Sequence, residues 1–267
     1  FVPSTVFDND ALLRSNPAYL ANLALLPEAE KQALLYGRWD SFSGQAFPEW
    51  RAHPDAPDGV GTHVIPPFRA PAHWLCYRGF DFGYSRPYAV GWFLADEEGR
   101  LYLVRELYGT TGTPNVGVRE HPAEIARRIR EIEQTDESLR GRRIIGVADP
   151  SIFDESRGES VARMMEKAPH FIAFRRGANA RLAGKMQFHY RLALPENARP
   201  MLQVFSTCAN FLRTLPALTY SAQEVEDIDT TQEDHLYDMA RYVMMEHPIS
   251  PPRAAPVRPR GDDPLDL

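Results

Sequence analysis

Near the middle of the chain, hydrophobic residues are grouped in short, mostly apolar runs that are typical of buried strands. Three such runs, rich in β-branched and aromatic residues, span residues 75–82, 88–94 and 101–108. The stretch DEEGR between the last two contains the acidic, glycine-containing pattern of a tight turn. These runs predict three consecutive antiparallel strands, which form a meander.

Downstream of the meander, helix-like and strand-like segments alternate. In the segment 121–134, Ile125, Ile129 and Ile132 lie on one side of a predicted helix. The following elements are predicted, in order, as strand 142–149, helix 158–168, strand 170–176, helix 181–194, strand 200–206, helix 208–218 and helix 232–246. Together with the meander they predict an α/β fold, in which a mixed sheet of antiparallel and parallel strands is flanked by helices.

Proline-rich stretches divide the chain into three zones. Residues 1–70 contain helical patches interrupted by prolines and are expected to form a connecting segment. Residues 71–247 form the compact domain, and residues 248–267, rich in Pro, Arg and Asp, are expected to be a disordered tail. The sequence does not begin with Met, so we expect a piece of a longer protein.

The composition is that of an ordinary globular protein and excludes few functional classes. The chain has 267 residues, of which 43% are hydrophobic and 25% charged, as in ordinary globular proteins. No apolar run is long enough to predict a membrane span. The net charge of −6 argues against a surface coated in positive charge, but it allows a local basic groove. Cys76 and Cys208 lack metal-site spacing and are expected to be buried thiols.

Acidic residues stand where the predicted strands end. Asp81 and Asp149 each close a buried strand, a costly position unless the carboxylate is paired, hydrogen-bonded or bound to a metal. If the two strands are neighbours, both carboxylates emerge at the same edge of the sheet. On the last predicted helix, Asp234, His235 and Asp238 stand at positions i, i+1 and i+4. His235 and Asp238 therefore share one side of that helix. The carboxylates of Asp81, Asp149 and Asp238 are ligands that suit Mg²⁺ or Mn²⁺. Two such ions held side by side can promote the hydrolysis of a phosphodiester.

One stretch of the chain is basic throughout. Residues 174–194 contain no acid and carry Arg175, Arg176, Arg181, Lys185 and Arg191. Such residues can bind backbone phosphates, which gives affinity for DNA without sequence specificity. A solvated helix face is the alternative explanation.

Several stretches together resemble the nuclease domain of the large terminase subunit of tailed bacteriophages. They read YRGFDFGYSRPYAVGWFLADEEGRLYLVRELYG, GVADPSIFD and EDHLYDMARYVM. Residues 15–50 resemble the segment that joins the ATPase of that family to its nuclease. The resemblance implies an RNase H-like fold and a DNA endonuclease with Mg²⁺ or Mn²⁺, two ions, as cofactor.

The resemblance also implies roles for individual residues. Asp81, Asp149 and Asp238 match the catalytic metal ligands, and His235 matches a position that approaches the metal in some relatives. Glu106 and Asp234 are candidate accessory acids, although Glu106 fits an exposed strand position equally well.

The family's role extends these expectations to partners. It implies double-stranded DNA as substrate, the small terminase subunit and the portal or procapsid as partners, and the host cytoplasm as the location. Residues 1–70 would then follow a missing N-terminal ATPase domain. The sequence contains no G-x-x-x-x-G-K-[ST] loop, so we expect this chain to cut DNA without hydrolysing ATP.

Three other functions remain open at this point. Another RNase H-like enzyme, such as a resolvase or a transposase, would share the acids and the metal but act on a different substrate. A sugar-kinase or actin-like ATPase would need a second glycine-rich phosphate loop, which we do not find. A nuclease-inactive docking module would carry the acids only as surface residues.

Overall fold

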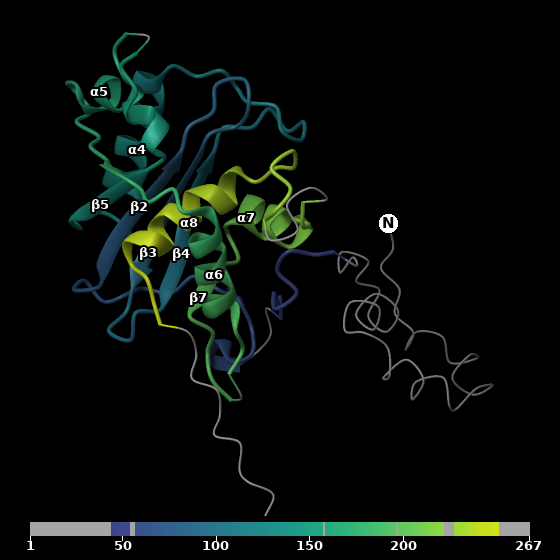
Figure 1. Cartoon of the computed structure of the whole chain (residues 1–267). Coiled ribbons are helices and arrows are strands. Elements are labelled where there is room, and N and C mark those ends of the chain that lie inside the picture. Colours follow the sequence, from purple (N-terminus) through teal and green to yellow (C-terminus); the bar gives the residue numbers. More distant parts are fainter. Residues whose placement is uncertain (1–43, 54–56, 157, 196, 222–226, 251–267) are drawn as a thin grey trace, which may run out of the picture.

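The computed structural model describes residues 44–53, 57–156, 158–195, 197–221 and 227–250. Within these residues the chain forms a seven-stranded mixed sheet with helices on both faces, which confirms the predicted fold class (Figure 1). The helical patches expected before residue 44 and the tail after residue 250 lie outside the described residues. None of the described helices combines the length and the apolar character needed to cross a membrane.

The predicted meander forms the centre of the sheet. Strands β2, β3 and β4 pair antiparallel in that order, and their bounds are Leu75–Asp81, Ala89–Ala95 and Leu101–Tyr108. The full strand order is β1-β7-β4-β3-β2-β5-β6, and the pairs outside the meander are parallel. The outer strands are β1 (Val64–Ile65), β5 (Ile144–Ala148), β6 (Arg175–Arg176) and β7 (Leu202–Phe205).

The two faces of the sheet are covered by different helices. The helices are α4 (Pro122–Thr135), α5 (Val161–Glu166), α6 (Arg181–Leu192), α7 (Ala209–Thr214) and α8 (His235–Glu246). Because side chains alternate along a strand, neighbouring residues of β2 identify the faces. Arg78 forms a buried ion pair with Glu133 of α4, whereas Gly79 faces Met239 of α8. In Figure 1, α6 and α7 lie beside α8 on its face of the sheet.

Two strand glycines allow α8 to lie close to the sheet. A Cβ at Gly79 would lie 2.5 Å from the carbonyl oxygen of Met239, and one at Gly91 would lie 2.5 Å from the sulfur of the same residue. Neither strand could carry a side chain here without displacing something. The close approach fixes α8, and therefore its acidic residues, against the end of β2.

Part of the expected connecting segment belongs to the sheet. Its residues Val64 and Ile65 form β1 and pair with β7. Ala46 and Phe47 are fully buried, and the Ala46 N–H donates to the Leu218 carbonyl at 2.8 Å. The compact domain therefore extends upstream of residue 70, because these apolar side chains complete its core.

Several predicted elements are shorter than the pattern indicated, and for two of them the structure shows the reason. The strand expected at 170–176 contains only Arg175–Arg176, because Phe171 has a positive φ of 52° and is 62% exposed. The helix expected at 208–218 ends as an α-helix at Thr214 and continues as the 3₁₀ turn Leu215–Ala217. Pro216 lacks the backbone N–H that a longer α-helix would use.

Candidate active site

The two strand-end aspartates emerge at one edge of the sheet, as the sequence predicted. Strands β2 and β5 are parallel neighbours, and Phe80 pairs with Ala148. Asp81 and Asp149 follow these paired residues directly, and the Asp149 N–H donates to the Phe80 carbonyl at 3.1 Å. The adjacency is set by the backbone, so it does not depend on any side-chain rotamer.

Helix α8 brings the remaining acids to this edge. Asp81, Asp234, His235 and Asp238 line one pocket, together with the loop that follows β2. His235 Nδ1 lies 3.1 Å from Asp81 Oδ2, and His235 Nε2 lies 2.9 Å from Asn115 Oδ1. The structure therefore joins a strand acid to helix residues that are more than 150 positions away in the sequence.

Asp149 stands beside the pocket rather than in its lining. Its Oδ2 accepts a hydrogen bond of 2.6 Å from the Tyr242 hydroxyl, and its Oδ1 accepts one from the Ser151 N–H. Burial alone would raise the pKa of Asp149, but the hydrogen bonds from Tyr242 and Ser151 outweigh burial and hold it below its usual value. Asp149 is therefore an anion at neutral pH.

The other acids repel one another. Burial raises the pKa of Asp81 to about 6, and the charges of Asp238 and Asp149 add to the effect, while His235 opposes it. Burial and the charge of Asp238 likewise raise the pKa of Asp234 to about 7. Burial lowers the pKa of His235, but the hydrogen bond to Asp81 and the negative charges of Asp81 and Asp234 together outweigh burial, so the net shift of the pKa is upward. A cation placed among these groups would relieve their repulsion.

The donor set fits a hard divalent cation, although the described side chains do not yet surround one. Among the described residues, no three His, Cys, Asp or Glu side chains stand close enough together to hold a metal ion. Asp238 is engaged elsewhere: Arg241 Nε donates to its Oδ1 at 2.8 Å, and Arg181 approaches its Oδ2 at 3.5 Å. Carboxylate oxygens are nevertheless the donors that Mg²⁺ and Mn²⁺ prefer.

Glu106, predicted as an accessory acid of the site, makes its hydrogen bonds at another helix. Its Oε1 accepts from the Asn210 N–H and side-chain amide, both at 2.8 Å, and its Oε2 accepts from the Phe211 N–H at 2.9 Å. Glu106 therefore caps the N-terminus of α7, where backbone donors lack partners within the helix. This role depends on a contact across the fold that the local sequence does not reveal.

Two of the five predicted DNA contacts are buried. Arg191 is 0% exposed and donates to three backbone carbonyls, those of Gly99, Met201 and His247. Lys185 is 5% exposed, and its ammonium lies 4.3 Å from the centre of the Tyr220 ring. The prediction that these two residues contact phosphates is therefore wrong, since both support the packing of α6.

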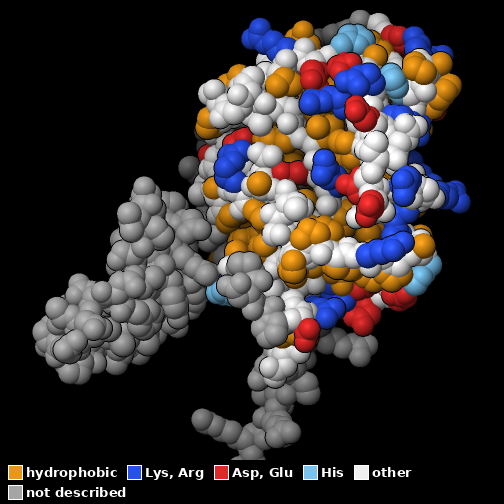
Figure 2. Space-filling model, turned by 180° about the vertical axis from the view of Figure 1, so that it is seen from behind, with side chains coloured by type: hydrophobic (Ala, Val, Ile, Leu, Met, Phe, Trp, Pro, Cys, Tyr) orange, Lys and Arg blue, Asp and Glu red, His pale blue; other side chains and the backbone are white. Residues whose placement is uncertain are grey.

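The other three basic residues remain accessible. Arg175 and Arg176 are exposed, and Arg181 is half-buried, paired at 2.6 Å with Asp227. Arg175 is within 3.0 Å of Glu246, so its charge is partly balanced. Figure 2 shows positive and negative side chains interspersed on the face opposite α8. A phosphate-binding surface is accordingly better sought around the acidic pocket than on that face.

Three residues around the site were missed by the sequence analysis. Tyr242 follows Asp238 by one helical turn, so the helix pattern could have placed it near Asp149. Arg241, fully buried, binds Asp238 from the same helix. Asn115, which holds His235, lies in a loop after β4, and nothing in its local sequence indicates this contact.

Comparison with known proteins places this arrangement in a recognised fold. No family model and no curated protein matches the sequence. The nuclease domain of the P22 large terminase superposes with a TM-score of 0.55 at 16% identity, over 76% of this chain and 92% of that one. The large terminase of a thermophilic bacteriophage, in complex with ATP-gamma-S, gives 0.54 at 18% identity, but the match covers 75% of this chain and only 44% of that one. The chain thus has the fold of the large-terminase nuclease domains, as the sequence resemblance implied.

Proposed function

We propose that this chain is a metal-dependent DNA endonuclease that forms the cutting domain of a phage DNA-packaging motor. The observation that carries the proposal is the convergence of Asp81, His235 and Asp238 in one pocket, with Asp149 directly after the adjacent strand β5. In this role the chain would cut concatemeric double-stranded DNA when packaging begins and ends, in the host cytoplasm. Its partners would be the small terminase subunit and the portal of the procapsid.

Three carboxylates would hold the cofactor. Asp81, Asp149 and Asp238 would bind Mg²⁺ or Mn²⁺, and two ions so bound can activate a water and stabilise the departing 3′ oxygen. Asp238 would have to exchange its contact with Arg181, which at 3.5 Å is already long, for the ion. Tyr242 and Ser151 keep Asp149 ionised and oriented for this task.

His235 would orient the pocket and hold a proton beside Asp81. The Asn115 side-chain amide donates to the Thr231 carbonyl at 3.2 Å, so its oxygen faces the imidazole. The imidazole Nε2 therefore donates to Asn115, and Nδ1 is directed at Asp81. From there His235 could position a water or exchange a proton with the carboxylate.

The DNA backbone would approach over the mouth of the pocket. Tyr84 and Arg86 line it from the loop after β2, and both are exposed. Arg175 and Arg176 extend positive charge from the nearby edge of the sheet. Contacts of this kind give affinity that falls as salt rises, with little sequence preference.

Plasmid cleavage tests the proposal. The chain should nick and linearise supercoiled plasmid with Mg²⁺ or Mn²⁺ but not with EDTA, and Asp81→Asn should abolish the activity. Glu98→Gln, which removes an exposed carboxylate from the opposite end of the meander, is the matched control and should cut normally. Cutting that survives in Asp81→Asn would overturn the proposal. A strong preference for four-way junctions would instead indicate a resolvase.

A further inference from the structure

An aromatic groove lies at the opposite end of β2 from the acidic pocket. Phe68, Trp74 and Tyr102 line it, and the rings of Trp74 and Tyr102 stack with centroids 5.1 Å apart. Phe68 packs edge-on against both rings and is still 36% exposed. Since β2 is seven residues long, at roughly 3.3 Å per residue, the groove is about 20 Å from Asp81. It therefore has no part in the chemistry proposed above.

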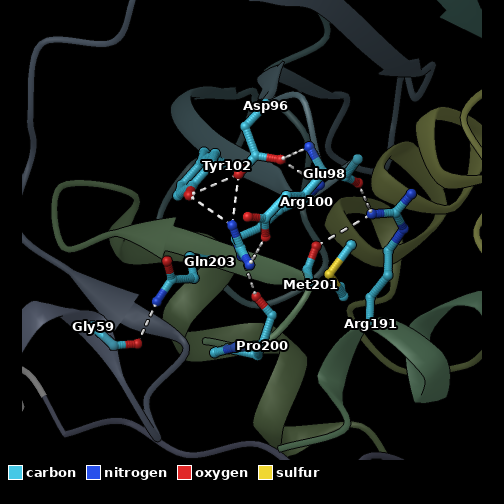
Figure 3. Close-up of polar contacts among 10 residues, drawn as sticks. Gly59, Asp96, Glu98, Arg100, Tyr102, Arg191, Pro200, Met201 and Gln203 are labelled. Atoms are coloured by element: carbon cyan, nitrogen blue, oxygen red, sulfur yellow. Dashed lines mark hydrogen bonds and ion pairs between the residues drawn. The ribbon is translucent and has the colours of Figure 1, made fainter. Parts of the chain in front are cut away.

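The walls of the groove are held by polar contacts beneath it. Figure 3 shows Arg100 bound to the carboxylates of Asp96 and Glu98 and to the Pro200 carbonyl. Beside it, the Gln203 amide donates to the Gly59 carbonyl at 2.7 Å. These contacts join segments that are distant in sequence, so the groove is formed before anything binds to it. A preformed groove loses little entropy on binding.

The rim of the groove is acidic. Its lining includes four carboxylates, against the two guanidinium groups of Arg100 and Arg199; they belong to Asp58, Asp96, Glu97 and Glu98. Glu97 and Glu98 are well exposed, at 67% and 73% of their side-chain area. A ligand that combines flat apolar groups with positive charge would suit this surface.

The described chain ends beside this rim. The Ile249 N–H donates to the Gln187 side chain at 2.9 Å, and the Gln187 amide donates back to the Ile249 carbonyl at 3.0 Å. A Cβ built on Gly99 would be 3.9 Å from Ile249 Cγ2. Gly99 belongs to the same turn as Glu97 and Glu98, so the tail starts next to the acidic rim.

The sequence that follows has the composition this groove requires. Residues 251–260 read PPRAAPVRPR, with four prolines, three arginines and no acid. Proline-rich segments favour the polyproline II helix, which rises about 3.1 Å per residue and binds aromatic grooves. Ten residues can therefore span about 31 Å. Tethering also supplies an effective concentration on the order of millimolar, so a weak intrinsic affinity is sufficient.

We propose that residues 251–260 of this chain dock in the aromatic groove as a polyproline II segment. The prolines would pack on Phe68, Trp74 and Tyr102, and the arginines would face Glu97 and Glu98. This gives the tail a binding site on its own domain. The proposal is independent of the nuclease assignment, since it involves neither the acidic pocket nor DNA.

Site-specific photo-crosslinking of the full chain, without DNA or metal, tests the proposal. With p-benzoylphenylalanine in place of Val257, mass spectrometry should find adducts within one molecule, on residues 66–75 and 96–102. The rim variant Glu97→Lys/Glu98→Lys should reduce their yield at least fivefold, and adding Arg258→Glu/Arg260→Glu should restore it. Glu124→Lys/Glu131→Lys, an equal double charge reversal on α4, should change nothing.

Three results would overturn the proposal. Adducts between two molecules would assign the groove to the tail of a second copy. Adducts spread over the whole surface would mean that the tail has no fixed site. An unchanged yield in the rim variant would remove the charge complementarity on which the proposal depends.

Discussion

Gly79→Ala should displace α8 and with it half of the candidate site. The new Cβ would lie 2.5 Å from the Met239 carbonyl oxygen and 2.9 Å from Val243 Cγ2. Comfortable contacts between such atoms begin near 3.5 Å, so the helix must retreat by about 1 Å. No rotamer change relieves the clash, because the first obstacle is backbone.

The magnitudes follow from this displacement. Overpacking of this kind lowers the free energy of unfolding by about 1–3 kcal/mol, which urea denaturation followed by circular dichroism would measure. The shift also moves His235 and Asp238 away from Asp81, and a misplacement of about 1 Å can reduce catalysis about 10²-fold. Plasmid cleavage with Mn²⁺ would measure that loss at a temperature where the variant is fully folded.

Gly91→Ala is the matched control, because its Cβ would meet the flexible end of the Met239 side chain rather than backbone. Methionine adapts readily, so the loss of stability should stay below about 1 kcal/mol and cleavage should be nearly unchanged. If Gly79→Ala proved as stable and active as the parent chain, or if both variants lost equal activity, α8 would not be held as described.

Three further predictions concern single residues. Tyr242→Phe removes the hydrogen bond to Asp149 and should slow cleavage about tenfold while changing stability by only about 1 kcal/mol; an unchanged rate would mean that Asp149 needs no such support. Glu106→Gln should cost about 1–2 kcal/mol of stability through the cap of α7, yet leave cleavage by the folded chain intact; a selective loss of cleavage would restore its role as an accessory acid. Burial lowers the pKa of His63 from 6.5 to about 4, so the unfolded chain takes up this proton at a higher pH than the folded chain does. The free energy of unfolding should therefore fall by about 3 kcal/mol as the pH drops from 6.5 to 4. Urea denaturation at several pH values measures how the free energy of unfolding depends on pH. His63→Gln should make this dependence weaker, and a dependence identical to that of the parent chain would refute the role given to His63.

Much of the fold could be predicted from local pattern. The meander and helix α8 are long and regular, and the strand-end positions of Asp81 and Asp149 follow from the apolar runs of β2 and β5. Their adjacency required only that β2 and β5 be neighbours, a common outcome in mixed sheets. The pattern was least reliable for short elements such as β1 and β6, in which two residues pair because of tertiary contacts.

Residues of the candidate site could be predicted only where a charged side chain stands at the end of a predicted strand or on one side of a predicted helix. A run of basic residues does not reveal which of them point inward, so Arg191 was predicted to contact DNA although it binds carbonyls in the interior. Glu106 is likewise committed to a helix that begins about a hundred residues later. Asn115 and Arg241 act only through contacts formed by folding, and single-sequence reasoning has no access to these.

Asp81, Asp149 and Asp238 are proposed to hold divalent cations together. Electron paramagnetic resonance during a Mn²⁺ titration measures this directly, since free and bound Mn²⁺ give distinct signals. Saturable binding of Mn²⁺ by the full chain is expected, weakened at least tenfold in each of Asp81→Asn, Asp149→Asn and Asp238→Asn and unchanged in Glu98→Gln. Binding of equal strength in the parent chain and all three aspartate variants would contradict the proposal.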